Sequence, residues 1–275
     1  MHLRLGESNP VAQTIVVARG MDSWVITFSN GKKARAVYAP TGAEVAAIIA
    51  ALELPSPRAI LIISSGASDM SPTEVGQLQE LLIEGVARVA AEEGIAVLDG
   101  GTRAGVMQMI GEGHAAAGST APLIGVCPAA LVSWPGGPAD DARIPLEPNH
   151  THFVLTDGDH WGAETETMFA LAIVLSNGIP SLALLANGGS VARREMLYNV
   201  RQGREIIVIR GSGRLADIIA AVVTGEMEPP DGEIATIVRD GRIILFNITD
   251  GPEALAALIR QRLLKGGKGD PVQQI

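Results

Sequence analysis

The chain has 275 residues, of which 47% are hydrophobic and 3% aromatic, and its formal net charge is -9. This acidic balance argues against nucleic acid or an anionic membrane as the main partner, so an anionic ligand would have to be held locally. The single cysteine, Cys127, excludes an internal disulfide framework and a cysteine-rich metal site. Residues 1–12 lack a signal-peptide pattern and no apolar run reaches the ~20 residues that span a bilayer, so we expect a cytoplasmic protein.

The chain begins with a β-rich addition, which we place at residues 1–40. Strand-like segments cover Thr14–Ala18, Trp24–Phe28 and Arg35–Tyr38. Asn30-Gly31 lies between the last two and is typical of a β-hairpin turn, so the sequence predicts a hairpin here.

From residue 41 to residue 225, predicted strands and helices alternate. Buried strands are expected at 59–63, 95–98, 123–126, 153–156, 181–185 and 206–209. Amphipathic helices are expected at 44–52, 73–91, 104–116, 164–175, 191–200 and 215–223. This alternation predicts an α/β fold in which helices cover both faces of a mostly parallel sheet.

Residues 226–275 are expected to pack on the same domain as a second hairpin and a last helix. Thr236–Val238 and Arg242–Phe246 flank Asp240-Gly241, which is another hairpin signal. A helix is predicted at Glu253–Leu264. The predicted architecture therefore has β-hairpin additions at both ends.

Glycine and small hydroxyl residues recur where predicted strands end. The four segments are Ser64-Ser65-Gly66, Gly100-Gly101-Thr102, Asn187-Gly188-Gly189-Ser190 and Gly211-Ser212-Gly213-Arg214. Because ligands of parallel sheets bind beyond the carboxyl ends of the strands, these segments can face a common crevice. Each alone is ordinary turn chemistry, but together they predict a site for an extended, phosphate-bearing molecule.

The most specific prediction concerns the last of these turns. A β-branched strand leads into Gly211-Ser212-Gly213, and Arg214 opens the next helix. The free amides of a first helical turn favour anions, and the guanidinium of Arg214 matches phosphate or carboxylate. The alternative is a tight turn whose glycines serve packing alone.

A second distinctive region starts at Asn149. His150 and His152 fall on one face of a strand because side chains alternate with a period of two. We rank contact with a ligand first, a buried structural hydrogen bond second and a metal site third. Glu164 follows at a helix start, where its carboxylate can accept hydrogen bonds from ribose hydroxyls.

Taken in order, these motifs resemble the amino-terminal homology region of melastatin-type transient receptor potential channels, over roughly residues 60 to 223. The matching segments are Gly100–Met107, Leu123–Pro128, Pro148–Phe153, Trp161–Glu164, Asn187–Gly189 and Gly211–Asp217. Since no channel segment is seen, the chain is similar to the prokaryotic LSDAT members of the SLOG superfamily. That resemblance implies a Rossmann-like nucleotide-binding domain at residues 41–225 and a ligand such as ADP-ribose.

The resemblance also implies which residues line the ligand. Glycine turns would hold the phosphates, with Arg214 and Arg103 offsetting their charge. The expected ligand-binding residues are Ser65, Gly66, Gly100, Gly101, Thr102, Arg103, Asn149, His150, Glu164, Asn187, Gly188, Gly189, Gly211, Ser212, Gly213 and Arg214. We expect no metal, no obligatory cofactor, and no nucleic-acid or membrane partner, and we leave homo-oligomerisation open.

The superfamily also contains phosphoribohydrolases, which carry a Pro-Gly-Gly-x-Gly-Thr-x-x-Glu motif. Pro135-Gly136-Gly137-Pro138 lacks its Gly-Thr, and the segment from Asn187 to Val191 lacks its glutamate, although Glu195 lies nearby. We therefore expect a ligand-sensing protein without catalytic residues. The alternative is a nucleotide N-glycoside hydrolase in which Glu164 or Asp99 activates water. A purely structural assembly protein is a third interpretation.

Overall fold

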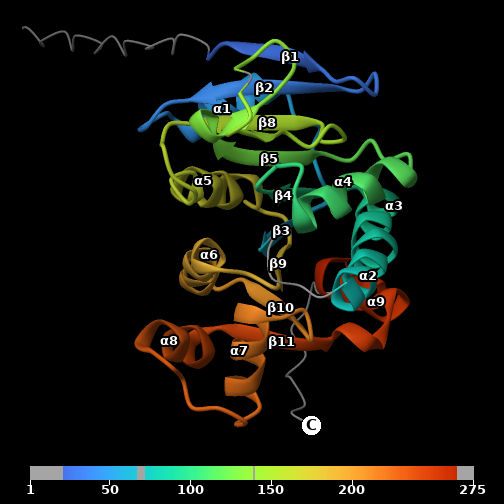
Figure 1. Cartoon of the computed structure of the whole chain (residues 1–275), viewed down its shortest axis with the longest axis vertical. Helices are drawn as coiled ribbons and strands as arrows, with labels where there is room; N and C mark the ends of the chain where they lie inside the picture. The colour runs from blue at the N-terminus through green and yellow to red at the C-terminus, as the bar shows by residue number, and fades with distance from the viewer. Residues whose placement is uncertain (1–20, 67–71, 139, 265–275) are drawn as a thin grey trace, which may run out of the picture.

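A computed structural model describes residues 21–66, 72–138 and 140–264 of the chain (Figure 1). The strands are β1 (Ser23–Thr27), β2 (Lys33–Ala39), β3 (Ala59–Ser65), β4 (Ile95–Asp99), β5 (Leu123–Pro128), β6 (Val132–Ser133), β7 (Ile144–Pro145), β8 (His152–Thr156), β9 (Ser181–Ala186), β10 (Glu205–Arg210) and β11 (Arg242–Asn247). The helices are α1 (Val45–Leu52), α2 (Pro72–Glu80), α3 (Arg88–Glu93), α4 (Gly105–Ala116), α5 (Thr165–Leu175), α6 (Ser190–Arg201), α7 (Arg214–Val223), α8 (Gly232–Asp240) and α9 (Pro252–Leu264).

Nine of these strands form one sheet in the order β1-β2-β8-β5-β4-β3-β9-β10-β11, and β6 and β7 form a small second sheet. Within the nine-stranded sheet, β1 and β2 are antiparallel and the other neighbours are parallel. The chain runs from β3 to β4 on one side and later enters β9 on the other side of β3. This arrangement confirms the predicted α/β, Rossmann-like fold class and creates a topological switch point beside β3.

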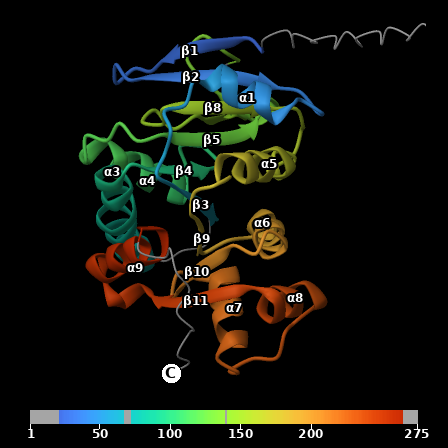
Figure 2. The same ribbon diagram turned by 180° about the vertical axis from the view of Figure 1, so that it is seen from behind.

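Helices cover both faces of the sheet (Figures 1 and 2). On β3, Leu61 and Ile63 pack with α2, α3, α4 and α9, whereas Ile60 and Ile62 face the side of α1 and α5. The helices α6, α7 and α8 cover β9 and β10 on this second side. A strand buried on both faces needs a continuous apolar run, which is the pattern that predicted β3 from the sequence.

The predicted helix at 73–91 is divided in the structure. A π-helical segment, η1 (Leu81–Ala87), separates α2 from α3. It packs closely against α9, where a Cβ added to Gly85 would lie 3.0 Å from the Pro252 oxygen, and against α4, where a Cβ added to Gly113 would lie 2.6 Å from the Cβ of Ala87. The other predicted helices and strands of this region occur within a few residues of their expected bounds.

The amino-terminal hairpin is confirmed, since β1 pairs with β2 across Asn30-Gly31 and Gly31 adopts a φ of 80°. The strand expected at Thr14–Ala18 lies outside the described residues. β2 also pairs in parallel with β8, so this hairpin extends the main sheet.

The predicted carboxy-terminal hairpin is wrong. The segment expected as a strand at 236–238 belongs to α8, and β11 pairs in parallel with β10. Asp231 caps α8 by accepting from the amides of Glu233 and Ile234, and Ile234 and Ile237 are buried one turn apart. Capping and burial therefore outweigh the β-branched character of this segment. None of the described helices is long and apolar enough to cross a membrane.

Candidate functional site

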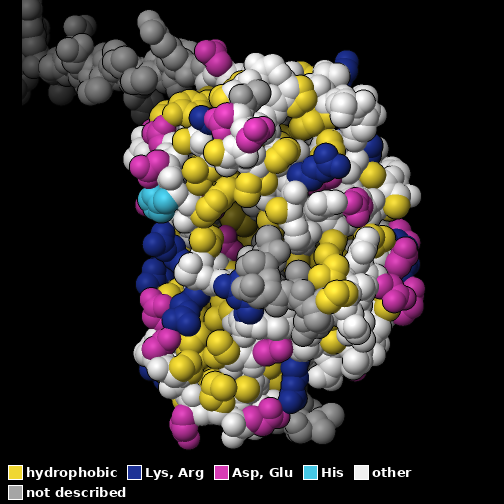
Figure 3. Space-filling view, viewed as in Figure 1, with side chains coloured by type: hydrophobic (Ala, Val, Ile, Leu, Met, Phe, Trp, Pro, Cys, Tyr) yellow, Lys and Arg dark blue, Asp and Glu magenta, His cyan; other side chains and the backbone are white. Residues whose placement is uncertain are grey.

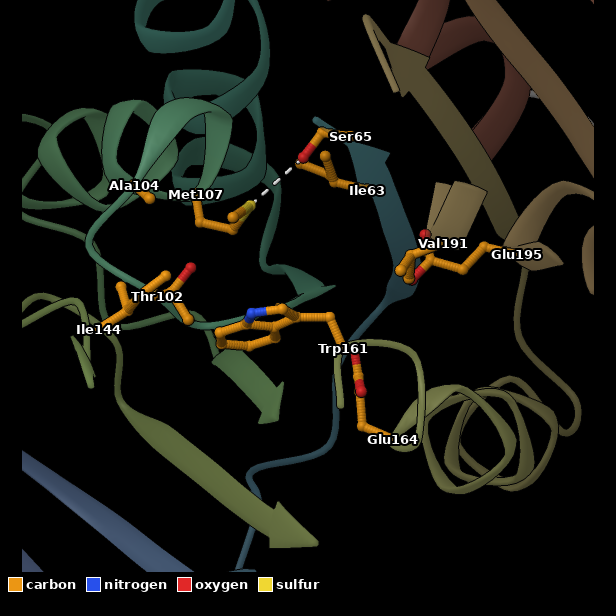
Figure 4. Close-up of a pocket in the computed structure, with 11 residues that line it drawn as sticks. Ile63, Ser65, Thr102, Ala104, Met107, Ile144, Trp161, Glu164, Val191 and Glu195 are labelled. Atoms are coloured by element: carbon orange, nitrogen blue, oxygen red, sulfur yellow. Dashed lines mark hydrogen bonds between the residues drawn. The ribbon is translucent and has the colours of Figure 1, made fainter. Parts of the chain in front are cut away.

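A cavity of about 240 Å³ lies at the carboxyl edge of the sheet, beside the switch point at β3; we call it the edge cavity (Figure 4). It is lined by Ile63, Ser65, Gly100, Thr102, Ala104, Met107, Ile144, Trp161, Glu164, Val191 and Glu195. Figure 3 shows this face of the molecule hollowed near its middle, with hydrophobic side chains around the hollow and Lys or Arg side chains below it. Its position is the one at which parallel α/β sheets bind ligands.

The loop after β4 forms one wall of the edge cavity and is tightly held. The amide of Gly101 donates to Asp99 Oδ1 at 2.7 Å, and the amide of Arg103 donates to the Pro145 oxygen at 2.8 Å. Gly101 has a φ of 66°, and a Cβ there would lie 2.6 Å from the Cα of Gly125. Gly101 thus allows the loop to touch strand β5, whereas its neighbours Gly100 and Thr102 reach the cavity.

Behind this loop, His150 lies fully buried between two carboxylates. Its Nε2 is 2.9 Å from Asp99 Oδ1, and its Nδ1 is 2.8 Å from Glu147 Oε2. Burial alone would lower the pKa of His150, but the charges and hydrogen bonds of Asp99 and Glu147 outweigh it and raise the pKa to about 9. His150 is therefore a buried cation that holds the loop. Asn149 joins the same network, because its Nδ2 donates to Glu147 Oε1 at 2.6 Å.

This geometry matches the second-ranked interpretation of His150, a buried structural hydrogen bond, since both ring nitrogens are already engaged. His152 lies apart from this network; burial and the charge of Arg35 lower its pKa to about 4. No group of three or more potential metal ligands occurs among the described residues.

Two acidic side chains line the edge cavity, one from the residue before α5 and one from α6. Glu164, just before α5, is 5% exposed, and its Oε2 accepts from the Gly162 amide at 2.8 Å. Burial raises the pKa of Glu164. Glu195 on α6 is 7% exposed, and burial raises its pKa to about 8; the Ser64 hydroxyl opposes this shift, while the charges of Glu164 and Asp99 add to it.

A second cavity, of about 490 Å³, lies at the start of α6; we call it the arginine cavity. It is lined by Gly188, Gly189, Ser190, Arg193, Arg194, Leu197, Arg214, Leu215, Ile218 and Glu233. α6 begins after Gly189 with no side-chain cap and no acid in its first turn. The guanidinium of Arg214 lies close to Gly189, because a Cβ there would be 3.2 Å from Arg214 Nη2.

Arg193 and Arg194 also line this cavity, and each contacts a neighbouring segment of the chain. Arg193 forms ion pairs with Asp231 at 2.7 Å and Glu233 at 3.7 Å. Arg194 donates to the Gly162 oxygen at 3.2 Å, which connects α6 to the loop that carries Trp161 and Glu164. The arginine cavity is therefore cationic along α6 and acidic where α8 begins.

The expectation that the Gly211–Gly213 turn offers free amides is wrong. The amides of Gly211 and Gly213 donate to the Asp217 carboxylate at 2.6 and 3.1 Å. The first amides of α7 are also engaged, because Leu215 and Ala216 donate to backbone oxygens of the loop after β9. Of this turn, Arg214 is the residue that lines a cavity.

Asn187 joins the loops after β9 and β10. Its amide donates to Ser212 Oγ at 2.7 Å, and its Nδ2 donates to the Ser212 oxygen at 3.0 Å. Gly66 allows a third loop to approach, since a Cβ there would lie 2.7 Å from Asn187 Oδ1. Asn187, Ser212 and Gly66 thus position the cavity walls.

The structure divides the expected site residues into four groups. Ser65, Gly100, Thr102 and Glu164 line the edge cavity, and Gly188, Gly189 and Arg214 line the arginine cavity. The side chain of Arg103 is exposed. The remaining expected residues hold loops: Gly66, Gly101, Asn149, His150, Asn187, Gly211, Ser212 and Gly213.

Sequence reasoning left several lining residues unassigned. Val191 and Glu195 are four residues apart on one face of α6 and meet the edge cavity, while Arg193 and Arg194 meet the arginine cavity. Residues four positions apart lie on one face of a helix, so the spacing of Val191 and Glu195 could have indicated that both side chains meet the same cavity. Trp161, which is 41% exposed, lies in the Trp161–Glu164 segment that matches the family, but the sequence predicted no role for its side chain.

The chain is similar in sequence to parts of known ion channels. Transient receptor potential cation channel subfamily M member 2 of Mus musculus is 24% identical over 204 residues, which are 61% of this chain and 13% of the channel. Subfamily M member 4 of Rattus norvegicus is 24% identical over 237 residues, 73% of this chain and 20% of the channel. The chain thus spans a fifth or less of these relatives.

Among solved structures, TM1055, a structural genomics target, aligns with a TM-score of 0.48 and 19% identity, over 74% of this chain and 99% of that one. The family model described as SLOG in TRPM, prokaryote, matches residues 58–257. The resemblance drawn from the motifs is confirmed: the chain belongs to the prokaryotic LSDAT family, SLOG in TRPM.

Proposed function

We propose that this chain binds a nucleotide-derived ligand such as ADP-ribose, with its phosphates in the arginine cavity and its sugar or base in the edge cavity. One observation carries the proposal: two cavities of opposite character flank the first turns of α6. Val191 and Glu195 face one, and Arg193 and Arg194 face the other. A nucleotide has the same division between an anionic part and a neutral, partly apolar part.

The start of α6 supports the phosphate position. Helix amino-termini favour negative charge, yet this one gathers arginines and has no acid in its first turn. Arg194 and Arg214 offer guanidinium donors whose geometry suits phosphate oxygens. An anion at this end would complement both the helix dipole and these side chains.

The edge cavity supports the neutral part of the ligand. Ile63, Met107 and Val191 provide apolar walls, and the indole of Trp161 lies across the cavity (Figure 4). Exposed aromatic rings stack on planar bases, and such stacking contributes about 1–3 kcal/mol per base. The Glu164 carboxylate supplies an acceptor for ribose hydroxyls.

Thermal shift and calorimetry on the full chain test this function, with ADP-ribose, cyclic ADP-ribose, NAD, AMP and GTP as probes. A ligand that binds the folded state raises the melting midpoint by mass action. Failure of every probe to raise the midpoint or give a calorimetric signal would contradict the proposal.

A single arginine tests the phosphate site. We expect Arg214→Ala to weaken ADP-ribose binding by about tenfold or more, because it removes a charge-assisted donor from the arginine cavity. Calorimetry measures the affinity, and a melting curve checks that the variant is folded. Arg58→Ala is the matched control, since Arg58 precedes β3 at the opposite edge of the sheet. Equal affinity of the two variants for ADP-ribose would contradict the proposed phosphate site.

One observation favours a second candidate, hydrolysis of a nucleotide N-glycosidic bond. Glu164 and Glu195 are two carboxyls in one cavity whose surroundings differ, which is a common arrangement of a catalytic acid and base. Asp99 suits this role less, because it is buried against His150 and the Gly101 amide. Chromatography for released base in the binding samples distinguishes turnover from binding.

A further inference from the structure

The edge cavity contains an unusual charge arrangement. Glu164 and Glu195 both line it, and none of the described residues lining it is a lysine or arginine. Two carboxylates that share a buried, partly apolar space repel each other, so one of them retains its proton. The protonated carboxyl then becomes a hydrogen-bond donor.

The contacts identify which carboxyl keeps the proton. Glu164 accepts from the Gly162 amide, and the charge of Arg194 favours its ionised form. The charges of Glu164, just before α5, and of Asp99, at the end of β4, oppose ionisation of Glu195, whereas a hydrogen bond from the Ser64 hydroxyl favours it. Glu195 is therefore the neutral acid and Glu164 the anion. Burial agrees, since it raises the pKa of Glu195 to about 8.

Other polar atoms at this edge also lack partners. Asp99 Oδ2, Thr156 Oγ1 and Thr165 Oγ1 are buried without a hydrogen-bond partner among the described residues. They come from the end of β4, the end of β8 and the start of α5, at the same edge of the sheet as the edge cavity, although none of the three residues lines it. Unsatisfied buried polar atoms are costly, so this edge of the sheet keeps uncompensated hydrogen-bonding capacity next to the edge cavity.

We propose that Glu195 determines specificity by donating a hydrogen bond from its neutral carboxyl to an uncharged acceptor of the ligand, while Glu164 accepts from an adjacent hydroxyl or N–H. This inference rests on the proposed function and orients the ligand. The edge cavity takes a sugar diol or the amide-like edge of a base and rejects phosphate. The phosphates are thereby directed to the arginine cavity.

The pH dependence of ADP-ribose binding tests the role of Glu195. Calorimetry on the full chain from about pH 6.5 to about pH 9.5 should show wild-type affinity falling by about tenfold or more at the alkaline end. Glu195→Gln, whose amide donates but does not titrate in this range, should bind within about threefold of wild type at neutral pH and change little with pH. Glu195→Met, similar in size but without a donor, should lose about tenfold at every pH.

The outcomes separate the two proposals. Wild-type chain that binds ADP-ribose while Glu195→Gln follows the wild-type pH profile overturns the role of Glu195 alone. Equal affinities for Glu195→Gln and Glu195→Met do the same. Wild-type chain that binds no ADP-ribose at any pH overturns the proposed function and this inference together. Melting curves of each variant across the same pH range confirm that it is folded.

Discussion

At the residue scale, the most consequential side chain outside the cavities is His150. It is a cation enclosed by Asp99 and Glu147, and through Asp99 it fixes the Gly101 amide. The sequence placed His150 near the site but could not show that both ring nitrogens are engaged, because Asp99 lies 51 positions away. Contacts of that range depend on the order of strands in the sheet.

Replacing His150 should therefore be costly. We expect His150→Gln to lower the free energy of unfolding by about 3–5 kcal/mol, since it leaves two buried carboxylates without their cation. Because the pKa of His150 is raised to about 9 from 6.5, its contribution is complete below about pH 6.5 and is lost as pH rises through about 9. Urea unfolding of variant and wild type across this range measures the difference.

The matched control for this prediction is His160→Gln, because His160 is exposed and its acidic neighbour Asp159 is also exposed. That change should leave the urea midpoint unaltered. A His150→Gln midpoint equal to that of wild type would show that the buried pairs contribute nothing to stability.

At the element scale, the turn between β10 and α7 shows what local patterns predict and what they miss. A strand, a glycine turn and a helix were all predicted at this position and are present. The hydrogen-bond acceptor of the turn amides was not predicted, because Asp217 appears in the sequence as an ordinary acid in the first turn of a helix. In the folded chain its carboxylate takes the place that an anionic ligand was expected to fill.

Asp217→Ala tests this anchoring. Loss of the acceptor leaves the amides of Gly211 and Gly213 without their partner, so we expect the free energy of unfolding to fall by about 1–3 kcal/mol. Asp217→Asn keeps one carbonyl acceptor and should lose less. Denaturant unfolding of both variants gives the comparison, and equal stability of the alanine variant and wild type would contradict the proposed anchor.

At the scale of the whole molecule, the sequence was sufficient for the α/β class and for most elements, because buried strands and amphipathic helices have different periods. It was insufficient for the site. The edge cavity joins residues of β3, α4, β7 and α6 with the loops after β4 and before α5, and these meet because the chain crosses from one side of β3 to the other. The prediction of a carboxy-terminal hairpin failed for a related reason: β11 pairs with β10, which is separated from it in the chain by α7 and α8.

The last prediction follows from the net charge of the whole molecule. With a formal net charge of -9, the chain repels an anionic ligand except where arginines gather, and at the arginine cavity Glu233 offsets Arg193. Glu233→Gln removes that acid from the cavity wall, so we expect ADP-ribose to bind about twofold to fivefold more tightly, and less so at high salt. Glu228→Gln makes the same charge change at an exposed position outside the cavity and should have little effect. Calorimetry at low and high ionic strength measures both variants. If both gain affinity equally, overall charge controls binding; if Glu233→Gln alone gains, the ligand's negative charge lies beside Arg193.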